Sequence, residues 1–363
     1  FEARLRCRRV AQTLQRNRPV LTLQKTAPEF GAMLVEKPEP SIGEGEVLVE
    51  VDAVGICGSD IHMYEWTPGY EWTAPSLPVV MGHEFSGKVA RVGPGVTGLA
   101  AGTPVVVTPG YFCGKCAECK AGKPDACRAK KSIGLTVDGG FARFVSVPAR
   151  TCIPISPDLP PHIAALTEPL VVGDRAVQIG TVEPGQNVVV LGPGIIGLAT
   201  AFIAKRAGAG SVTVVGKSDP LRLGIAKQLG ADRVIDLADG GPKLSDHIEE
   251  RSVDRVFEAT GFGESITQGL GLLKDYGIMA SIGIHPAPAS IDITPFVRRK
   301  LQLRGCHGGG RDCWDRVLAL LPDNQNALGA IVTHQIPMSE AIEGFELNRR
   351  REACKVVIRP GMA

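Results

Sequence analysis

The sequence predicts an α/β protein of two domains, one rich in short strands and one built on a doubly wound parallel sheet. This rests on a length of 363 residues, a run of four cysteines between 113 and 127, and a glycine-rich turn directly after an apolar strand near residue 190. At about 150 residues per domain, the length accommodates two hydrophobic cores. We expect residues 1–172, completed by 315–363, to form the first domain and residues 173–314 the second.

The first domain is predicted from short β-rich runs that glycine and proline separate. Such runs lie at 20–25, 47–54, 85–92 and 104–108. Strands of this length and spacing indicate a barrel-like or sandwich domain. Its loops would carry the chemistry, because loops held by a rigid scaffold supply many binding and catalytic residues.

The second domain is predicted from strands that alternate with helices. Strands are expected at 187–191, 211–215, 233–236, 254–258 and 277–282, and helices at 195–206 and 221–229. This alternation implies a parallel sheet with helices on both faces. A last helix from about 315 and strands at 331–335 and 355–359 could rejoin the first domain.

The overall charge is close to balanced. Lysine and arginine total 40 against 38 for aspartate and glutamate, a net charge of +2. This balance gives no basis for binding nucleic acid or a charged membrane surface. No apolar run approaches the roughly 20 residues that span a bilayer. We therefore expect small-molecule partners, with no nucleic acid and no membrane.

Cysteine usage and the N-terminal segment bear on where the protein resides. The 10 cysteines are too few for a disulfide scaffold, and four have metal-site spacing, which favours a reducing compartment. We expect a cytoplasmic protein. Residues 1–21 contain six Arg and one acidic residue, which excludes a secretory signal but is compatible with an organellar transit segment. We favour an extension that leads into the first strand.

The strongest local signal is the cysteine run itself. Cys113, Cys116, Cys119 and Cys127 fall in one short glycine- and lysine-containing stretch. Four thiolates can wrap a tetrahedral zinc and leave no open position, which is typical of a structural site. Four metal-free thiols and an iron–sulfur cluster are the alternatives, although the spacing does not match the bacterial ferredoxin run.

A second group of candidate ligands lies earlier in the chain. Cys57 is followed by Ser59 and His62, and His83 and Glu84 come after a proline-containing stretch. Cys, His and Glu are the mixture expected of a zinc that keeps one position for water or substrate. Each residue alone is weak evidence, because a lone Cys is more often a core residue and a lone His is more often a structural group with its hydrogen bonds satisfied.

The glycine-rich turn predicts a dinucleotide site. Gly192, Gly194 and Gly197 follow the apolar strand at 187–191, and Ile195 and Ile196 open the next helix. Glycines in this context let a pyrophosphate approach backbone amides at a helix N-terminus.

The end of the next strand predicts which dinucleotide binds. Lys217 stands where an acidic residue usually accepts from the ribose of NAD, and Ser218 and Arg222 follow it. These side chains could bind a 2′-phosphate, so we expect a preference for NADP. NAD remains possible because Asp219 could take the ribose role in a shifted loop.

Two further strand ends could border the nicotinamide. Thr260 follows the strand at 254–258, and Ile282 ends the strand at 277–282. His285 lacks a metal-like partner pattern.

Taken together, these motifs resemble the zinc-containing medium-chain alcohol dehydrogenases. Gly-Ile-Cys57-Gly-Ser-Asp-x-His62, Gly-His83-Glu84, the cysteine run and Glu168-Pro-Leu occur in that order. The resemblance implies a GroES-like catalytic domain, a Rossmann domain and a homo-oligomer, either tetramer or dimer. It implies that Cys57, His83 and Glu84 bind the catalytic zinc and that Glu168 is a fourth, exchangeable ligand.

The same resemblance implies a proton path and a substrate class. Ser59 would hydrogen-bond the alcohol, and His62 would pass its proton to solvent. The ligand set resembles the polyol and threonine dehydrogenase branches. Glu168-Pro169-Leu170 favours a secondary alcohol on a polyol or sugar, whereas the stretch from His62 to Trp66 resembles L-threonine 3-dehydrogenase. A nucleotide-binding protein without turnover and a zinc-free NADPH reductase are further alternatives.

Overall fold

The computed structural model describes residues 19–123, 126–238 and 243–362, which form two compact units. Unit 1 contains residues up to Leu166 together with His334–Arg349 and Val356–Ala363, and unit 2 contains Thr167–Thr333 and Arg350–Lys355. The predicted N-terminal extension at 1–18 lies outside the described residues. In the described part of the chain, no helix is both long and apolar enough to cross a membrane.

Unit 1 is a β-rich domain with short helices. Its strands are β1 (Pro19–Lys25), β2 (Met33–Pro38), β3 (Glu46–Gly55), β4 (Val79–Val80), β5 (Glu84–Val92), β6 (Pro104–Val107), β7 (Gly110–Tyr111), β8 (Lys131–Ser132), β9 (Phe144–Pro148), β10 (Cys152–Pro154), β17 (Val332–Pro337) and β18 (Lys355–Arg359). Its helices are α2 (Gly58–Glu65), η1 (Glu71–Ser76), α3 (Ala117–Lys120), η3 (Ala149–Thr151), α4 (Pro161–Ala164), η4 (Met338–Glu340) and α12 (Ala341–Arg349).

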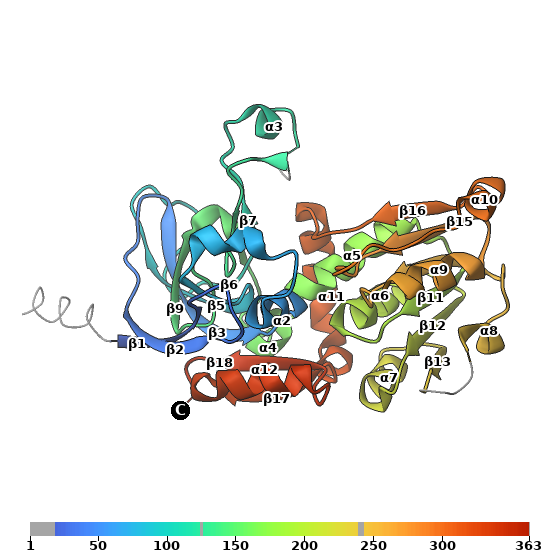
Figure 1. Cartoon of the computed structure of the whole chain (residues 1–363). Coiled ribbons are helices and arrows are strands. Elements are labelled where there is room, and N and C mark those ends of the chain that lie inside the picture. The colour runs from blue at the N-terminus through green and yellow to red at the C-terminus, as the bar shows by residue number, and fades with distance from the viewer. Residues whose placement is uncertain (1–18, 124–125, 239–242, 363) are drawn as a thin grey trace, which may run out of the picture. The chain divides into compact units, whose positions relative to one another are not determined.

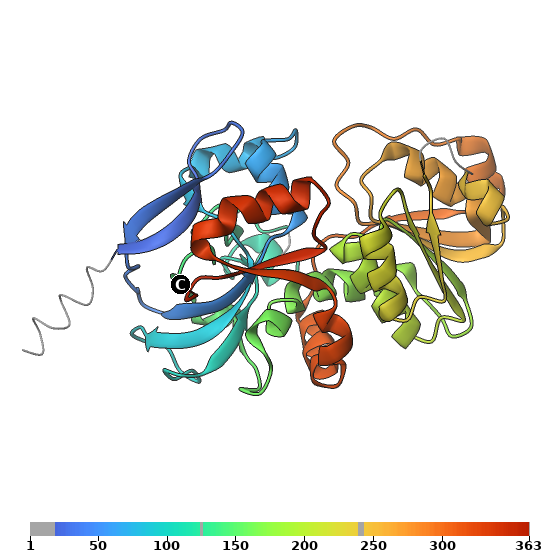
Figure 2. The ribbon, with the colours of Figure 1, turned by 90° about the horizontal axis from the view of Figure 1, so that it is seen from below.

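The main sheet of unit 1 is built around β3. The strand order is β10-β6-β5-β3-β18-β17, and β9 also pairs with β3. The valines of β3 are buried, whereas Glu50 and Asp52, which alternate with them, are only partly buried, so this part of the strand turns one face to the core. C-terminal β18 pairs antiparallel with β3, and α12 lies alongside β17 and β18 (Figure 2). Residues near the chain end therefore belong to unit 1.

Unit 2 is an alternating α/β domain. Its strands are β11 (Asn187–Leu191), β12 (Ser211–Gly216), β13 (Arg233–Asp236), β14 (Val253–Glu258), β15 (Leu273–Ser281) and β16 (Gln302–Gly305). Its helices are α5 (Thr167–Gly180), α6 (Ile195–Arg206), α7 (Pro220–Gln228), α8 (Leu244–His247), α9 (Gly263–Leu272), α10 (Ile293–Arg298) and α11 (Arg311–Gly329).

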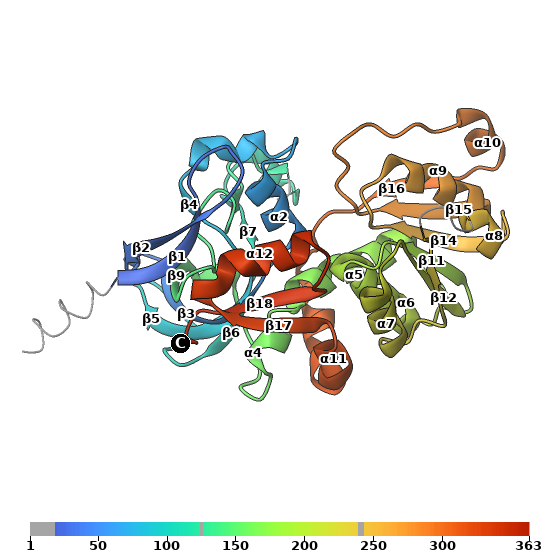
Figure 3. The same cartoon turned by 60° about the horizontal axis from the view of Figure 1, so that its bottom comes forward.

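The sheet of unit 2 is parallel and doubly wound. Its order is β13-β12-β11-β14-β15-β16, and each pair of neighbouring strands is parallel. Helices α6 and α7 cover one face and α9 covers the other (Figure 3). Connections between parallel strands are right-handed, and the chain crosses the sheet from β11 towards β13 but in the opposite direction from β14 towards β16. The connecting helices therefore lie on opposite faces of the sheet. The predicted fold class is confirmed.

The units differ from the predicted domains at two boundaries. The expected boundary at 172/173 falls inside α5, a helix that the sequence analysis did not anticipate. The range 315–333 belongs to unit 2 because α11 packs on α5, with Val317 and Leu321 buried. Composition changes along the chain do not reveal such a packing partner.

Candidate metal centres and dinucleotide site

Three of the predicted zinc ligands meet in unit 1. Cys57 is the N-cap of α2, and Glu84 is the first residue of β5. His83 follows Gly82, whose φ of 90° and close packing on Phe141 leave no space for a side chain. The ligand atoms of Cys57, His83 and Glu84 all lie within 4.8 Å of one another. A soft thiolate, an imidazole and a carboxylate at this spacing fit a zinc ion.

Asp60 holds this group together. Its Oδ2 accepts from the backbone N–H of Cys57 at 2.9 Å, and its Oδ1 lies 3.6 Å from Nδ1 of His83. Burial lowers the pKa of His83, but Asp60 and Cys57 beside it raise that pKa well above its usual value. No sequence pattern indicated a role for Asp60, although a carboxylate behind a metal-binding histidine orients the ring.

The two predicted relay residues lie on the same helix. Ser59 and His62 stand three residues apart on α2, which places them on one face. The Ser59 hydroxyl lies 3.3 Å from Nε2 of His83, and Nδ1 of His62 lies 3.0 Å from the Thr67 hydroxyl. The His62 ring stacks on Tyr70, and burial lowers the pKa of His62, an effect that Glu65 opposes. His62 therefore favours the neutral form, which can accept a proton.

Glu168, the predicted fourth ligand, lies in unit 2. It occupies the first turn of α5, directly before Pro169, and is half-buried. Proline is tolerated in a first helical turn because its missing N–H has no partner there.

The four-cysteine run forms a lobe in unit 1. This lobe, which contains α3, projects from the sheets of unit 1 (Figure 1). The sulfurs of Cys113, Cys116, Cys119 and Cys127 all lie within 4.8 Å of one another, and those of Cys113 and Cys127 are 3.6 Å apart. Backbone N–H groups of Lys115 and Cys116 lower the pKa of Cys113 to about 6. Each of these cysteines is a free thiol, so the cluster fits a four-thiolate zinc site.

The glycine turn of unit 2 packs closely against the start of α6. Gly192 has φ of 102°, and a Cβ on Gly197 would lie 1.8 Å from the carbonyl oxygen of Gly192. Gly194 caps α6, and a Cβ there would meet no atom within 4 Å. Ile195 and Ile196 then begin the helix. The open N-terminus of α6 fits a pyrophosphate.

The turn after β12 distributes its charges unequally. Lys217 and Ser218 are exposed, and Ser218 has φ of 50°. Asp219 is only 6% exposed. It caps α7 by accepting from the backbone N–H of Arg222, and its Oδ2 lies 3.4 Å from the guanidinium Nε of the same residue. The carboxylate of Asp219 is thus engaged inside the protein.

A buried carboxylate connects the other two predicted cofactor residues. Glu258 ends β14, and its Oε1 accepts from the backbone N–H and the hydroxyl of Thr260. Its carbonyl oxygen accepts from the N–H of Ile282 at 2.8 Å, and Oε2 lies 2.9 Å from Nε2 of His285. The contact between Glu258 and His285 could not be predicted from the sequence, because two residues 27 apart carry no local signal of contact.

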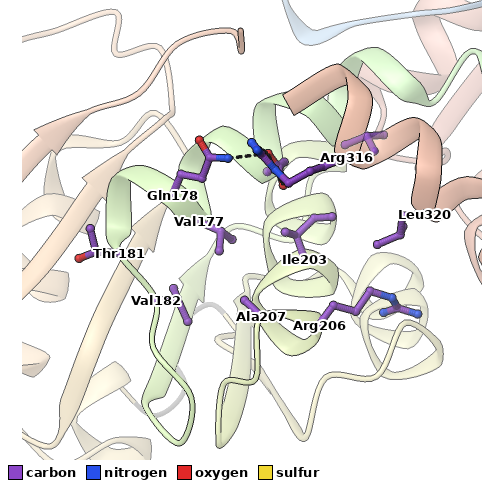
Figure 4. Close-up of a pocket in the computed structure, with 11 residues that line it drawn as sticks. Val177, Gln178, Thr181, Val182, Ile203, Arg206, Ala207, Arg316 and Leu320 are labelled. Atoms are coloured by element: carbon purple, nitrogen blue, oxygen red, sulfur yellow. Dashed lines mark hydrogen bonds and ion pairs between the residues drawn. The ribbon is translucent and has the colours of Figure 1, made fainter. Parts of the chain in front are cut away.

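Unit 2 also contains a cavity of about 520 Å³ between α5, α6 and α11 (Figure 4). Its apolar wall includes Val177, Ile203 and Leu320. Asp174 and Arg316 form an ion pair in its lining, with their nearest atoms 2.7 Å apart. The lining residues of α6 are near its C-terminus, so this cavity lies away from the glycine turn.

Comparison with known proteins identifies the family of both units. Residues 43–157 match the alcohol dehydrogenase GroES-like domain, and residues 196–323 match the zinc-binding dehydrogenase model. The L-threonine 3-dehydrogenase of Bacillus velezensis is 34% identical over 346 residues, which cover 91% of this chain and 96% of that protein.

Solved structures give the same result. One is a candidate zinc-binding dehydrogenase from Sinorhizobium meliloti 1021 that was solved with bound NADP. It has a TM-score of 0.83 and 28% sequence identity, and the match covers 95% of this chain and 100% of that one. The 2R,3R-butanediol dehydrogenase of Bacillus subtilis has a TM-score of 0.83 and 28% identity, and the match covers 94% of this chain and 100% of that one. The chain therefore belongs to the zinc-containing medium-chain dehydrogenase family and is an oxidoreductase.

Proposed function

We propose that the protein oxidises a secondary alcohol to a ketone, with zinc held by Cys57, His83 and Glu84 and with NADP as the preferred hydride acceptor. The observation that carries this proposal is the convergence of these three ligand atoms within 4.8 Å, beside the Ser59 hydroxyl. Glu168 is proposed as a fourth, exchangeable ligand. When bound, zinc supplies the Lewis acidity that lowers the pKa of an alcohol, and the nicotinamide accepts the hydride.

Two residues of α2, Ser59 and His62, would carry the proton of the substrate hydroxyl away from the reacting carbon. Ser59 is placed to accept a hydrogen bond from the substrate hydroxyl and to take its proton as the carbon loses hydride. His62, one turn further along α2 and favoured in its neutral form by burial, receives the proton and releases it to solvent. Thr67 and Tyr70 keep its ring in place.

The choice of NADP rests on the turn after β12. The exposed ammonium of Lys217 and hydroxyl of Ser218 offer partners for a 2′-phosphate. Asp219 is committed to capping α7 and to Arg222, so it offers no carboxylate to the ribose of NAD. The NADP bound by the Sinorhizobium meliloti relative supports this choice.

Two classes of secondary alcohol compete as substrate. A polyol or sugar is our first proposal, supported by the Glu168-Pro169-Leu170 motif and by the butanediol dehydrogenase among the structural relatives. L-Threonine is the second, supported by the Bacillus velezensis relative and by the stretch from His62 to Trp66. The two differ in charge, because threonine brings a carboxylate and an ammonium next to its hydroxyl.

The experiment is reduction of NADP and of NAD by the zinc-loaded protein with polyols, aldoses, simple secondary alcohols and L-threonine. Turnover of a polyol or sugar, faster with NADP, is the expected result. Preference for L-threonine with NAD would replace both the substrate and the cofactor proposed. Binding of dinucleotide without turnover of any alcohol would contradict the proposed reaction and favour a nucleotide-binding role.

We also propose a homo-oligomer, a dimer or a tetramer, in the cytoplasm. Strand β16 is the edge of the unit 2 sheet, and Leu303 on it and Ile293 and Val297 on α10 are exposed apolar side chains. Open strand edges beside apolar residues favour pairing with another chain. Sedimentation velocity measures the assembly directly, and a monomer at micromolar concentration would contradict it.

A further inference from the structure

We propose that Glu258 and His285 are positioning residues for the nicotinamide half of the cofactor. This inference rests on the proposed function, since it assumes that the protein binds a nicotinamide dinucleotide. It adds to that function two residues that lie outside the glycine turn, the 2′-phosphate turn and both metal sites.

The first step is the hydrogen bonding of Glu258. The side chain is 0% exposed. Its Oε1 accepts from the backbone N–H of Thr260 at 2.6 Å, the hydroxyl of Thr260 at 2.5 Å and the N–H of Gly261 at 2.9 Å, while Oε2 lies 2.9 Å from Nε2 of His285. A buried carboxylate is costly unless several donors satisfy it, and here both oxygens have donors.

The second step is that this carboxylate joins two strand ends. Thr260 and Gly261 follow β14, and His285 follows β15. The carbonyl oxygen of Glu258 also accepts from the N–H groups of Ile282 at 2.8 Å and of Gly283 at 3.1 Å. The loops that leave β14 and β15 are therefore fixed to each other through one residue.

The third step places these loops on one side of the dinucleotide site. The strand order is β13-β12-β11-β14-β15-β16, so successive strands are added on one side of β11 up to β13 and on its other side from β14 onward. Ligands of such sheets bind at the carboxyl ends of the strands where the direction reverses. The glycine turn follows β11 and the proposed 2′-phosphate turn follows β12, so the adenosine half belongs on that side. The nicotinamide half then belongs on the side of β14 and β15.

The fourth step is an atom that points to a ligand. Nδ1 of His285 is buried and has no hydrogen-bond partner among the described residues. The other ring nitrogen, Nε2, is hydrogen-bonded to the carboxylate of Glu258. A nicotinamide carboxamide carries both a donor and an acceptor, so it can satisfy Nδ1 in either protonation state of the ring.

The test compares two ligands by isothermal titration calorimetry on the zinc-loaded protein. One is NADP, and the other is 2′-phospho-ADP-ribose, which lacks the nicotinamide ring. The variants are Glu258→Gln and His285→Leu. The control is Asp174→Asn, which alters another buried, ion-paired carboxylate of unit 2 in the cavity between α5, α6 and α11.

The expected result is a dissociation constant for NADP raised about tenfold or more in both variants, equivalent to the loss of about one hydrogen bond. The dissociation constant for 2′-phospho-ADP-ribose should stay unchanged, and Asp174→Asn should change neither. Equal weakening of both ligands in His285→Leu, or an unchanged affinity for NADP in that variant, would overturn the inference. If Glu258→Gln does not fold, His285→Leu decides alone.

Failure of the proposed function has a different signature. If the unmodified protein binds neither NADP nor NAD, the cofactor proposal and this inference are both overturned. If it binds NADP tightly and His285→Leu binds it equally well, only the role of His285 and Glu258 is overturned.

Discussion

A single exposed lysine carries most of the argument for cofactor choice. Lys217 stands at the end of β12, where a carboxylate would serve NAD, and the nearest carboxylate, Asp219, is buried against α7 and Arg222. The sequence alone left open whether Asp219 could take the ribose role. Its capping hydrogen bond supplies the physical reason against that alternative.

Replacing Lys217 with Asp tests this directly. We expect the ratio of kcat/KM for NADP over NAD to fall by about a hundredfold, because a cation near the 2′-phosphate becomes an anion. Steady-state kinetics with both cofactors measure the ratio. Lys227→Asp, the same charge change on an exposed residue of α7, is the matched control and should leave the ratio near its original value. An equal ratio in Lys217→Asp and the unmodified protein would remove the lysine from the selectivity argument.

At the scale of elements, the close contact between the glycine turn and α6 shapes the proposed dinucleotide site. A Cβ on Gly197 would lie 1.8 Å from the carbonyl oxygen of Gly192, so the turn and the helix would have to separate. We expect Gly197→Ala to weaken NADP binding by about tenfold or more. Calorimetric titration measures this affinity.

A second helical glycine provides the control. A Cβ on Gly224, inside α7, would meet nothing within 4 Å. Gly224→Ala should leave NADP binding unchanged and raise the free energy of unfolding by about 0.5–1 kcal/mol, since alanine loses less conformational entropy in a helix. Similar NADP affinities for the two variants would show that the contact at Gly197 is not needed for binding.

A buried lysine ties the first strand to the helix that carries Ser59 and His62. Lys25 is 0% exposed, and its ammonium donates to the carbonyl oxygens of Glu29, Gly31 and Tyr64. Tyr64 is in the last turn of α2, where a cation also favours the helix dipole. Lys25 therefore stabilises the C-terminal end of this helix.

The pKa of Lys25 predicts a pH dependence of stability. Burial lowers this pKa from 10.5 to about 8, an effect that Glu29 opposes. Above pH 8 the folded protein has lost a proton that the unfolded chain keeps until about pH 10.5, so the contribution of this group to stability rises with pH in that window.

The measurement compares urea unfolding of the unmodified protein and Lys25→Met at pH 7.5 and pH 9.5. The difference in unfolding free energy should shift in favour of the unmodified protein at the higher pH. Lys227→Met, at an exposed position, should show no such shift. A difference for Lys25→Met that is the same at both pH values would contradict the titration assigned to Lys25.

At the scale of the whole molecule, local patterns predicted the elements better than their assembly. Strand β11 and helix α6 occur at the predicted residues because an apolar strand, a glycine turn and a helix are all encoded within 20 positions. The short helix α2 was not predicted, since its sequence has no apolar periodicity. Helix α11 was placed in the wrong unit because its packing on α5 is a long-range contact.

The same division holds for the candidate sites. Spacing indicated the four-cysteine cluster, and the resemblance to the dehydrogenase family implied the Cys57 cluster; the fold brings the ligand atoms of each cluster together. The supporting groups could not be predicted, because Asp60 behind His83 and Glu258 beside His285 depend on how distant segments fold. Patterns therefore indicated the candidate ligand residues, whereas the structure was needed to find the groups that support them.

The central claim is that zinc at Cys57, His83 and Glu84 is needed for alcohol oxidation, separately from the zinc of the cysteine lobe. The most direct measurement is zinc content per chain, determined together with NADP-linked alcohol oxidation, for the unmodified protein and for Cys57→Ser. We expect two zinc ions per chain in the unmodified protein and one in Cys57→Ser. Cys57→Ser should turn over alcohol at least about a thousandfold more slowly and bind NADP with unchanged affinity. Full turnover by Cys57→Ser, or an active unmodified protein that contains no zinc, would contradict the claim.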